Sequence, residues 1–352
     1  MGTALDVVAD PPRAVHDEPL WRRLARRCIT IPTFAGVAVL LLVAAPLWLP
    51  CAVVVDLLRR TRFSSVRALT FLTALFWLEV LGVAIAFAIA PPRLFRFVDE
   101  ERFLAWNTAL QTGWVRALYT LVLRIFSLEV EVSGQEHVAG GPLYVLIRHV
   151  SVGDTLFPGV FVTGATGLRL RYVLKDELLW DPCLDVVGHR LPNAFVRRES
   201  GASDTEIEKV RLLARQLSSS DGVLVFPEGT RFTPSKRARA LEKLASRDPA
   251  LVPLAERLTH VLPPKVGGVL ALLEEDPRVD VLFCAHAGLD GIETIGHLFD
   301  GSLVGRRVTV KFWRVSAETI PSSTDARVRW LFDEWAQVSR VVAEHAARHP
   351  VI

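Results

Sequence analysis

Two long apolar runs occupy the first part of the chain. No charged residue lies between Cys28 and Val55, and a second apolar run extends from Ala68 to Ala90. Both runs exceed the ~20 residues that a membrane-spanning helix requires. Pro46 and Pro50 are expected to kink or end the first run, so a shallow re-entrant path is also open. The pattern predicts a two-segment membrane anchor over residues 31–92, preceded by a basic tail over residues 1–30.

Glu79 is the one charged residue inside the second apolar run. An ionised carboxylate in the centre of a bilayer is costly, so its presence needs an explanation. A functional role is one interpretation. The other interpretations are that the hairpin lies shallow in the membrane, or that Glu79 faces its partner helix.

Helix-like and strand-like patterns alternate over the remaining residues, 93–352, which we interpret as one catalytic domain. Helical periodicity predicts an amphipathic helix over Phe103–Phe126 and further helices over Asp204–Leu217 and Asp325–Arg348. Apolar or alternating runs predict strands at Leu128–Val132, Leu143–Ile147, Leu168–Leu174, Val223–Phe226, Val279–Ala285 and Val308–Val315. Alternating elements of this kind indicate an α/β fold, a sheet flanked by helices with its site in polar loops at strand ends.

Composition supports membrane segments combined with one soluble domain. The 352 residues are 51% hydrophobic and 22% charged, with a formal net charge of +3. The arginines near the N-terminus, in the segment Trp21–Arg27, suit an anionic lipid surface, and no nucleic acid is expected as a partner. The four cysteines are widely spaced without neighbouring histidines at ligand spacing, so neither disulfides nor a metal site is expected. The flanking arginines weakly favour cytoplasmic termini at an inner or plasma membrane.

The candidate chemistry begins at His149, directly after the predicted strand Leu143–Ile147 and Arg148. Asp154 follows five residues later, and Gly153 makes a turn between the two residues easy. A carboxylate that holds one imidazole nitrogen leaves the other nitrogen to accept a proton from an alcohol. A pair with this spacing also occurs by chance, with His149 as an ordinary loop histidine, so further motifs must decide.

Two further motifs follow in order, Phe195-Val196-Arg197-Arg198 and Phe226-Pro227-Glu228-Gly229-Thr230-Arg231. Together with His149-x4-Asp154 they resemble the first three motif blocks of the glycerolipid acyltransferase family, the 1-acylglycerol-3-phosphate acyltransferases. The resemblance extends from about Phe103 to the last predicted helix, and the apolar hairpin resembles the membrane anchor of the family. The continuation Phe232-Thr233-Pro234 looks most like the lysophosphatidate and lysocardiolipin branch.

The resemblance implies acyl transfer from a thioester, acyl-CoA or acyl carrier protein, to a lysophospholipid hydroxyl, without a covalent enzyme intermediate or a cofactor. By position, His149 would be the base and Asp154 its orienting partner. The substrate-binding residues would be Glu228, Gly229, Thr230, Arg231 and Arg198. Lys175, in a segment that resembles the K-x-E-L of the family, would contact phosphate or be a solvated charge at a strand end.

Two positions depart from the family pattern. In Leu262-Pro263-Pro264-Lys265-Val266-Gly267-Gly268, Pro264 stands where the family has arginine, and Lys265 could supply the charge without the bidentate fork. Arg148 stands where asparagine is common, and it is expected either to contact the acceptor phosphate or to face solvent. These departures leave the acceptor open between 1-acylglycerol 3-phosphate, another lysophospholipid, a lyso-aminolipid and glycerol 3-phosphate.

Two other classes of function remain open. Ser151 could serve as the nucleophile of a lipid hydrolase, although the chain has no G-x-S-x-G elbow. A non-catalytic membrane adaptor is the second class, but a binding surface has no need for a His-Asp pair.

Overall fold

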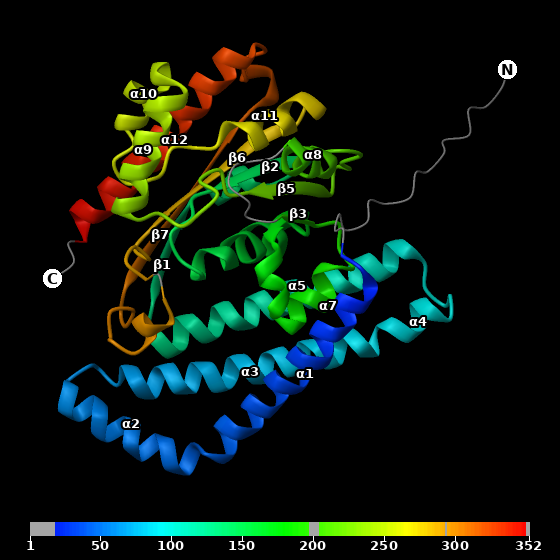
Figure 1. The fold of residues 1–352 in the computed structure, drawn as a ribbon, viewed down its shortest axis with the longest axis vertical. Helices are drawn as coiled ribbons and strands as arrows, with labels where there is room; N and C mark the ends of the chain where they lie inside the picture. The colour runs from blue at the N-terminus through cyan, green and yellow to red at the C-terminus, as the bar shows by residue number, and fades with distance from the viewer. Residues whose placement is uncertain (1–17, 197–203, 293, 350–352) are drawn as a thin grey trace.

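The structure, a computed structural model, describes residues 18–196, 204–292 and 294–349, and these form a seven-stranded sheet with helices on both faces (Figure 1). The strands are β1 (Glu129–Ser133), β2 (Leu143–Ile147), β3 (Arg169–Lys175), β4 (Ala194–Val196), β5 (Asp221–Val225), β6 (Asp280–Ala287) and β7 (Arg307–Val315). The helices are α1 (Leu20–Val43), α2 (Ala45–Arg59), α3 (Ser64–Ala88), α4 (Ala90–Leu94), α5 (Glu100–Phe126), α6 (Gly164–Thr166), α7 (Pro182–Gly188), α8 (Asp204–Leu213), α9 (Pro234–Arg247), α10 (Val252–Glu256), α11 (Val266–Glu275) and α12 (Thr324–Arg348). Shorter helical segments are η1 (Gln135–Val138), η2 (Gly153–Thr155), η3 (Pro158–Thr163), η4 (Asp176–Trp180), η5 (Pro249–Leu251), η6 (Ile295–Leu298) and η7 (Ala317–Thr319).

The strand order is β1-β7-β6-β2-β5-β3-β4. Strands β6, β2, β5, β3 and β4 run parallel, whereas β7 is antiparallel to β6 and parallel to β1. The carboxyl ends of the five parallel strands therefore share one edge, where α/β proteins place their sites. The predicted α/β class is confirmed, while the short strand β4 and the reversed direction of β7 were not predicted.

The central strands are buried on both faces. Every residue of β2 and of β5 is buried, which explains their continuous apolar runs. Tyr144 and Leu146 pack on the side of α8, α11 and α12, and Leu143, Val145 and Ile147 pack on the side of Phe126 in α5. The sheet is thus the middle of three layers, with α8–α12 above it and α5 and α7 below it in Figure 1.

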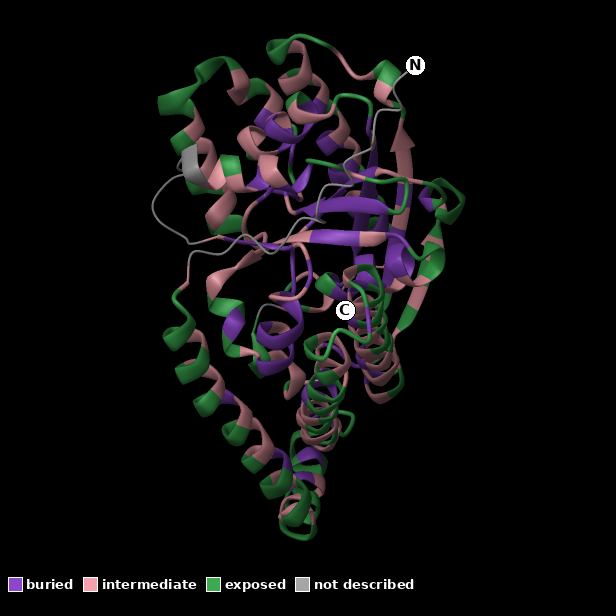
Figure 2. Cartoon of the chain, turned by 90° about the vertical axis from the view of Figure 1, so that its right-hand side faces the viewer, coloured by how far each residue is buried: buried purple, intermediate pink, exposed green. Residues whose placement is uncertain are grey.

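The N-terminal helices lie beyond the α5 side of the sheet (Figure 1). The first apolar run is divided at Ala44, since α1 ends there and α2 begins with Pro46 in its first turn. Two helical stretches, Leu20–Val43 and Ser64–Leu94, are long and apolar enough to cross a membrane. Figure 2 shows that buried residues concentrate in the sheet and its neighbours, whereas these long helices are mostly exposed or intermediate. The boundary expected at residue 30 lies inside α1.

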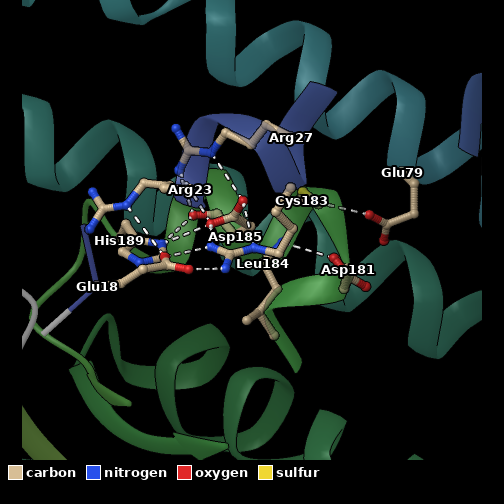
Figure 3. A network of polar contacts seen from close by, with 10 residues as sticks. Glu18, Arg23, Arg27, Glu79, Asp181, Cys183, Leu184, Asp185 and His189 are labelled. Carbon is tan, nitrogen blue, oxygen red and sulfur yellow. Dashed lines mark hydrogen bonds and ion pairs between the residues drawn. The ribbon is translucent and has the colours of Figure 1, made fainter. Parts of the chain in front are cut away.

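The basic start of α1 is bonded to α7 (Figure 3). Asp185, which is buried, accepts a hydrogen bond of 2.9 Å from Arg26 Nη2 and one of 3.0 Å from Arg27 Nε. His189 Nδ1 lies 3.0 Å from the same carboxylate. Burial alone would raise the pKa of Asp185, but the bonds from His189, Arg26 and Arg27 hold it well below its usual range. Two arginines of the expected lipid-facing patch therefore bind the α/β domain instead.

Glu79 of α3 also points to α7. Its side chain is buried, and Oε2 accepts a hydrogen bond of 3.2 Å from the main-chain nitrogen of Cys183 (Figure 3). The expectation that Glu79 faces a partner helix of the hairpin is therefore wrong, because the carboxyl group binds the start of α7. Together with Asp185, it fixes α7 between α1 and α3.

Candidate active site

The loop after β2 brings His149 and Asp154 together. His149 Nδ1 lies 3.0 Å from Asp154 Oδ1, and the His149 side chain keeps 12% of its surface exposed. The reversal is completed by η2, so that Asp154 folds back under the imidazole. His149 Nε2 makes no hydrogen bond within the described residues. The arrangement leaves Nε2 as the nitrogen that can exchange a proton with a ligand.

Asp154 is fully buried, and its carboxylate accepts several hydrogen bonds. Its Oδ2 accepts hydrogen bonds from the main-chain nitrogens of Val150, at 2.6 Å, and Ser151, at 2.8 Å. Burial would raise the pKa of Asp154, but the bond with His149 and these main-chain bonds hold it below its usual value. The carboxylate is therefore an ionised acceptor that fixes the orientation of His149.

Glu228, in the turn after β5, joins three loops. Its Oε1 accepts a hydrogen bond of 3.1 Å from the main-chain nitrogen of His149, and Oε2 accepts one of 3.1 Å from that of Leu262. Burial raises the pKa of Glu228 to about 8 even though the charge of Arg148 opposes the shift. Both carboxyl oxygens are thus turned to main-chain amides. Glu228 therefore fixes the main chain of His149 relative to the segment that leads to Pro264 and Lys265.

The same turn places Gly229 against Lys265. Gly229 has a φ of +65°, the left-handed region that favours glycine, and a Cβ there would lie 2.8 Å from Lys265 Nζ. The main-chain nitrogen of Lys265 donates to Pro227 O at 2.8 Å. Pro264 is buried, whereas Lys265 is exposed and carries a charge. The structure therefore brings the expected lysine to the turn after β5.

Thr230 and Arg231 complete this turn and are both partly buried. The main-chain nitrogen of Phe232 donates to His149 O at 2.9 Å, which keeps Arg231 next to the base in the fold. Lys175 ends β3 and pairs in register with Val196 of β4, so it lies at the same edge of the sheet. Arg197 and Arg198 follow Val196 and lie outside the described residues.

Arg148 differs from both expectations. Its side chain is fully buried, so it neither faces solvent nor is open to an acceptor phosphate. Nη1 donates to His286 O at 2.8 Å, Nη2 donates to His260 O at 3.0 Å, and the guanidinium forms an ion pair with Asp290. Arg148 is a structural cation that holds the strand ends around His149.

Two residues near the dyad were not predicted, His286 at the end of β6 and Asp290 after it. His286 is fully buried, with Nε2 3.6 Å from Asp154 Oδ2. The sequence offers one modest signal for it, a histidine at the end of the apolar run Val279–Ala285. Only the pairing of β6 with β2 shows that this run ends beside His149.

Comparison with known proteins agrees with this geometry. The acyltransferase family model matches residues 129–272, which include β1–β5, His149, Asp154 and the turn after β5. The chain therefore carries an acyltransferase domain, and it is an acyltransferase.

Individual relatives match large parts of the chain. The chain is 20% identical to 1-acyl-sn-glycerol-3-phosphate acyltransferase epsilon of Mus musculus, over 73% of this chain and 70% of that protein. It is 22% identical to lysocardiolipin acyltransferase 1 of Gallus gallus, over 78% of this chain and 71% of that protein. It is 31% identical to 1-acyl-sn-glycerol-3-phosphate acyltransferase of Pseudomonas aeruginosa, over 48% of this chain and 61% of that protein. The crystal structure of the 1-acyl-sn-glycerophosphate acyltransferase PlsC from Thermotoga maritima matches 78% of this chain and 98% of its own, with a TM-score of 0.49 and 20% identity.

Proposed function

We propose that this enzyme transfers a fatty acyl group from a thioester to the free hydroxyl of 1-acylglycerol 3-phosphate and so forms phosphatidate. The names of the relatives from Mus musculus and Pseudomonas aeruginosa support this acceptor. The observation that carries the proposal is the contact of 3.0 Å between His149 Nδ1 and Asp154 Oδ1, beside the turn that bears Arg231. A base and a phosphate-binding cation are the two groups that this reaction requires.

The proposed mechanism is general-base catalysis. His149 Nε2 accepts the proton of the acceptor hydroxyl while the oxygen of that hydroxyl attacks the thioester carbonyl carbon. The tetrahedral intermediate collapses, the carbon–sulfur bond breaks, and the thiolate receives the proton back from His149. Asp154 stabilises the imidazolium formed between these steps. No cofactor is required, and acyl-CoA or acyl carrier protein is the co-substrate.

Arg231 and Lys265 are the proposed contacts of the acceptor phosphate, with Arg198 and Lys175 as further candidates. A guanidinium can pair with two phosphate oxygens at once, whereas an ammonium acts as a point charge. The approach of Lys265 to Gly229 supports a cationic turn next to His149. Gly229 and Thr230 shape this turn, and we assign Glu228 to its internal support.

The geometry disfavours a serine hydrolase. Ser151 is buried, and its Oγ accepts a hydrogen bond of 3.3 Å from the main-chain nitrogen of Asp154. This bond stabilises the turn between His149 and Asp154. A nucleophilic hydroxyl would instead have to reach a histidine nitrogen and the substrate.

We also propose that α1–α4 attach the enzyme to a membrane, with residues 93–352 as the catalytic domain on the cytoplasmic face. Large apolar side chains of these helices are exposed, among them Leu40, Leu47, Leu58 and Phe87. Exposed apolar surface of this extent is typical of proteins that contact lipid or partners. The anchor would hold the site near a substrate that resides in the bilayer.

A product assay tests the proposed function. Purified protein in lipid nanodiscs is supplied with labelled 1-acylglycerol 3-phosphate, other lysophospholipids, a lyso-aminolipid or glycerol 3-phosphate, each with acyl-CoA and with acyl carrier protein. We expect phosphatidate to form with the highest kcat/KM. Preferred acylation of another acceptor would overturn the substrate assignment, and release of free fatty acid without transfer would indicate a hydrolase.

A further inference from the structure

His286 is a second histidine beside the His149–Asp154 pair. It follows Cys284 by two residues in β6, just as His149 follows Ile147 in β2, and Ile147 pairs with Cys284 in the sheet. The two histidines therefore stand next to each other at the ends of adjacent strands. His286 is fully buried, and the edge of its ring contacts Phe157 at a centroid distance of 5.2 Å.

Arg148 and His286 hold each other by reciprocal hydrogen bonds. The ring atom His286 Nε2 bonds to Arg148 O at 2.8 Å, and Arg148 Nη1 donates to His286 O at 2.8 Å. Asp290 forms an ion pair with the guanidinium and so neutralises its charge. The carbonyl that His286 binds belongs to the peptide unit leading directly into His149. A shift of His286 would therefore move the main chain of the base.

The hydrogen-bond partners of His286 define its tautomer. A carbonyl oxygen only accepts hydrogen bonds, so the proton of a neutral His286 must be on Nε2. Nδ1 is buried without a hydrogen-bond partner among the described residues. Burial and the charge of Arg148 lower the pKa of His286, although Asp154 and Asp290 act in the opposite direction. A neutral ring adds no positive charge that would compete with protonated His149 for Asp154.

We propose that His286 is a positioning residue for the base: its Nε2–H fixes the Arg148 carbonyl and thereby the main chain that carries His149. This inference rests on the proposed role of His149 as general base. His286 itself does not touch the substrate. Its effect should appear in the chemical step and leave both substrate-binding constants unchanged.

Two substitutions separate the donor from the bulk of the side chain. In His286→Leu the volume is largely kept and the N–H is lost, whereas in His286→Gln the side-chain amide nitrogen can replace Nε2. We expect kcat of His286→Leu to fall by roughly 10- to 100-fold, in keeping with the cost of misplacing a reacting group. Because His286 does not touch the substrate, both KM values should stay within about twofold. His286→Gln should recover most of the lost kcat. The control is His345→Leu, which removes another buried histidine, bonded to Thr309 at 2.9 Å, and should lower stability without changing kcat.

The outcomes distinguish this inference from the proposed function. If His149→Ala is inactive but His286→Leu turns over normally, or if His286→Gln is as impaired as His286→Leu, the inference is overturned alone. If His149→Ala is fully active, the proposed mechanism fails first. ¹⁵N-histidine NMR of the unsubstituted protein gives a test that does not depend on variants folding. It should show the proton of the neutral His286 ring on Nε2 at about pH 8, where an ordinary histidine is already neutral. A proton on Nδ1 of the neutral ring would contradict the inference.

Discussion

Asp154 uses its two oxygens differently: Oδ1 lies 3.0 Å from His149 Nδ1, while Oδ2 accepts the main-chain hydrogens of Val150 and Ser151. The carboxylate therefore cannot rotate without losing two hydrogen bonds. This division of roles fixes the His149 tautomer with the proton on Nδ1. Nε2 is then free to accept a proton.

Asp154→Asn should disable the base with little change in folding. The amide oxygen of asparagine should bind the two main-chain hydrogens, which turns its NH₂ group toward His149 Nδ1. Nδ1 would then have to accept, and the proton would move to Nε2, where it blocks general-base catalysis. We expect kcat to fall by ~10² to 10⁴. Steady-state kinetics and a thermal melt of the same preparation check this, and a loss of less than tenfold in a folded variant would argue against the tautomer role.

Arg231 is expected to act on the acceptor rather than on the thioester. A charge-assisted hydrogen bond contributes roughly 1.5 to 3 kcal/mol, so Arg231→Ala should raise the acceptor KM by about 10- to 150-fold. Arg231→Lys keeps the charge without the fork and should raise KM by less. The matched control is Arg239→Ala on the exposed surface of α9. A fall in kcat alone would assign Arg231 to the transition state, and a rise in the thioester KM alone would assign it to the donor.

Glu228→Gln should change the pH dependence of stability. The folded pKa of Glu228, about 8, is above its ordinary value of 4.5, so folding favours the protonated form. The contribution of protonated Glu228 to the free energy of unfolding is therefore present in full below about pH 4.5 and is lost as the pH rises to about 8. Glutamine cannot titrate, and its NH₂ group opposes a main-chain N–H, so the variant should be less stable by about 1 to 3 kcal/mol at low pH.

The difference in melting temperature between the native protein and Glu228→Gln should therefore narrow as the pH rises from about 4.5 to about 8. Melting curves recorded over this range measure it directly. A difference that widens with pH would show that Glu228 is ionised in the folded protein.

Asp185→Asn should weaken the attachment of α1 to the α/β domain. The substitution leaves Arg26, Arg27 and His189 opposite a neutral amide. Removing one partner of a buried ion pair typically costs about 3 to 5 kcal/mol. We expect a lower melting temperature and faster proteolysis within α1. Asp333→Asn is the control, since its ion pair with Arg257 is exposed and should contribute little.

Local pattern was enough to predict the parts of the site that lie on one stretch of chain. The strand before His149, the turn to Asp154 and the turn after β5 each have a short-range signature, and parallel strands bring their ends to one edge. The class of fold followed from the alternation of helices and strands. The order of the strands did not, because pairing depends on contacts between distant residues.

The interpretation of charged residues was less successful for the same reason. Arg148 was expected to contact phosphate or solvent, but it is buried and bonded to Asp290 and to the carbonyl groups of His260 and His286. Glu79 and Asp185 bind partners far away in the sequence, as does Glu228. The sequence around a charged residue does not show whether that residue has a buried partner from a distant part of the chain. Burial and partner identity had to come from the structure.

The most direct test of His149 as the general base is the rate of phosphatidate formation from 1-acylglycerol 3-phosphate and a thioester by native protein and by His149→Ala, prepared identically in nanodiscs. We expect transfer by the native protein and at least ~10²-fold slower turnover by the variant, with similar melting temperatures and acceptor affinity. Near-native turnover by a folded His149→Ala protein would contradict it.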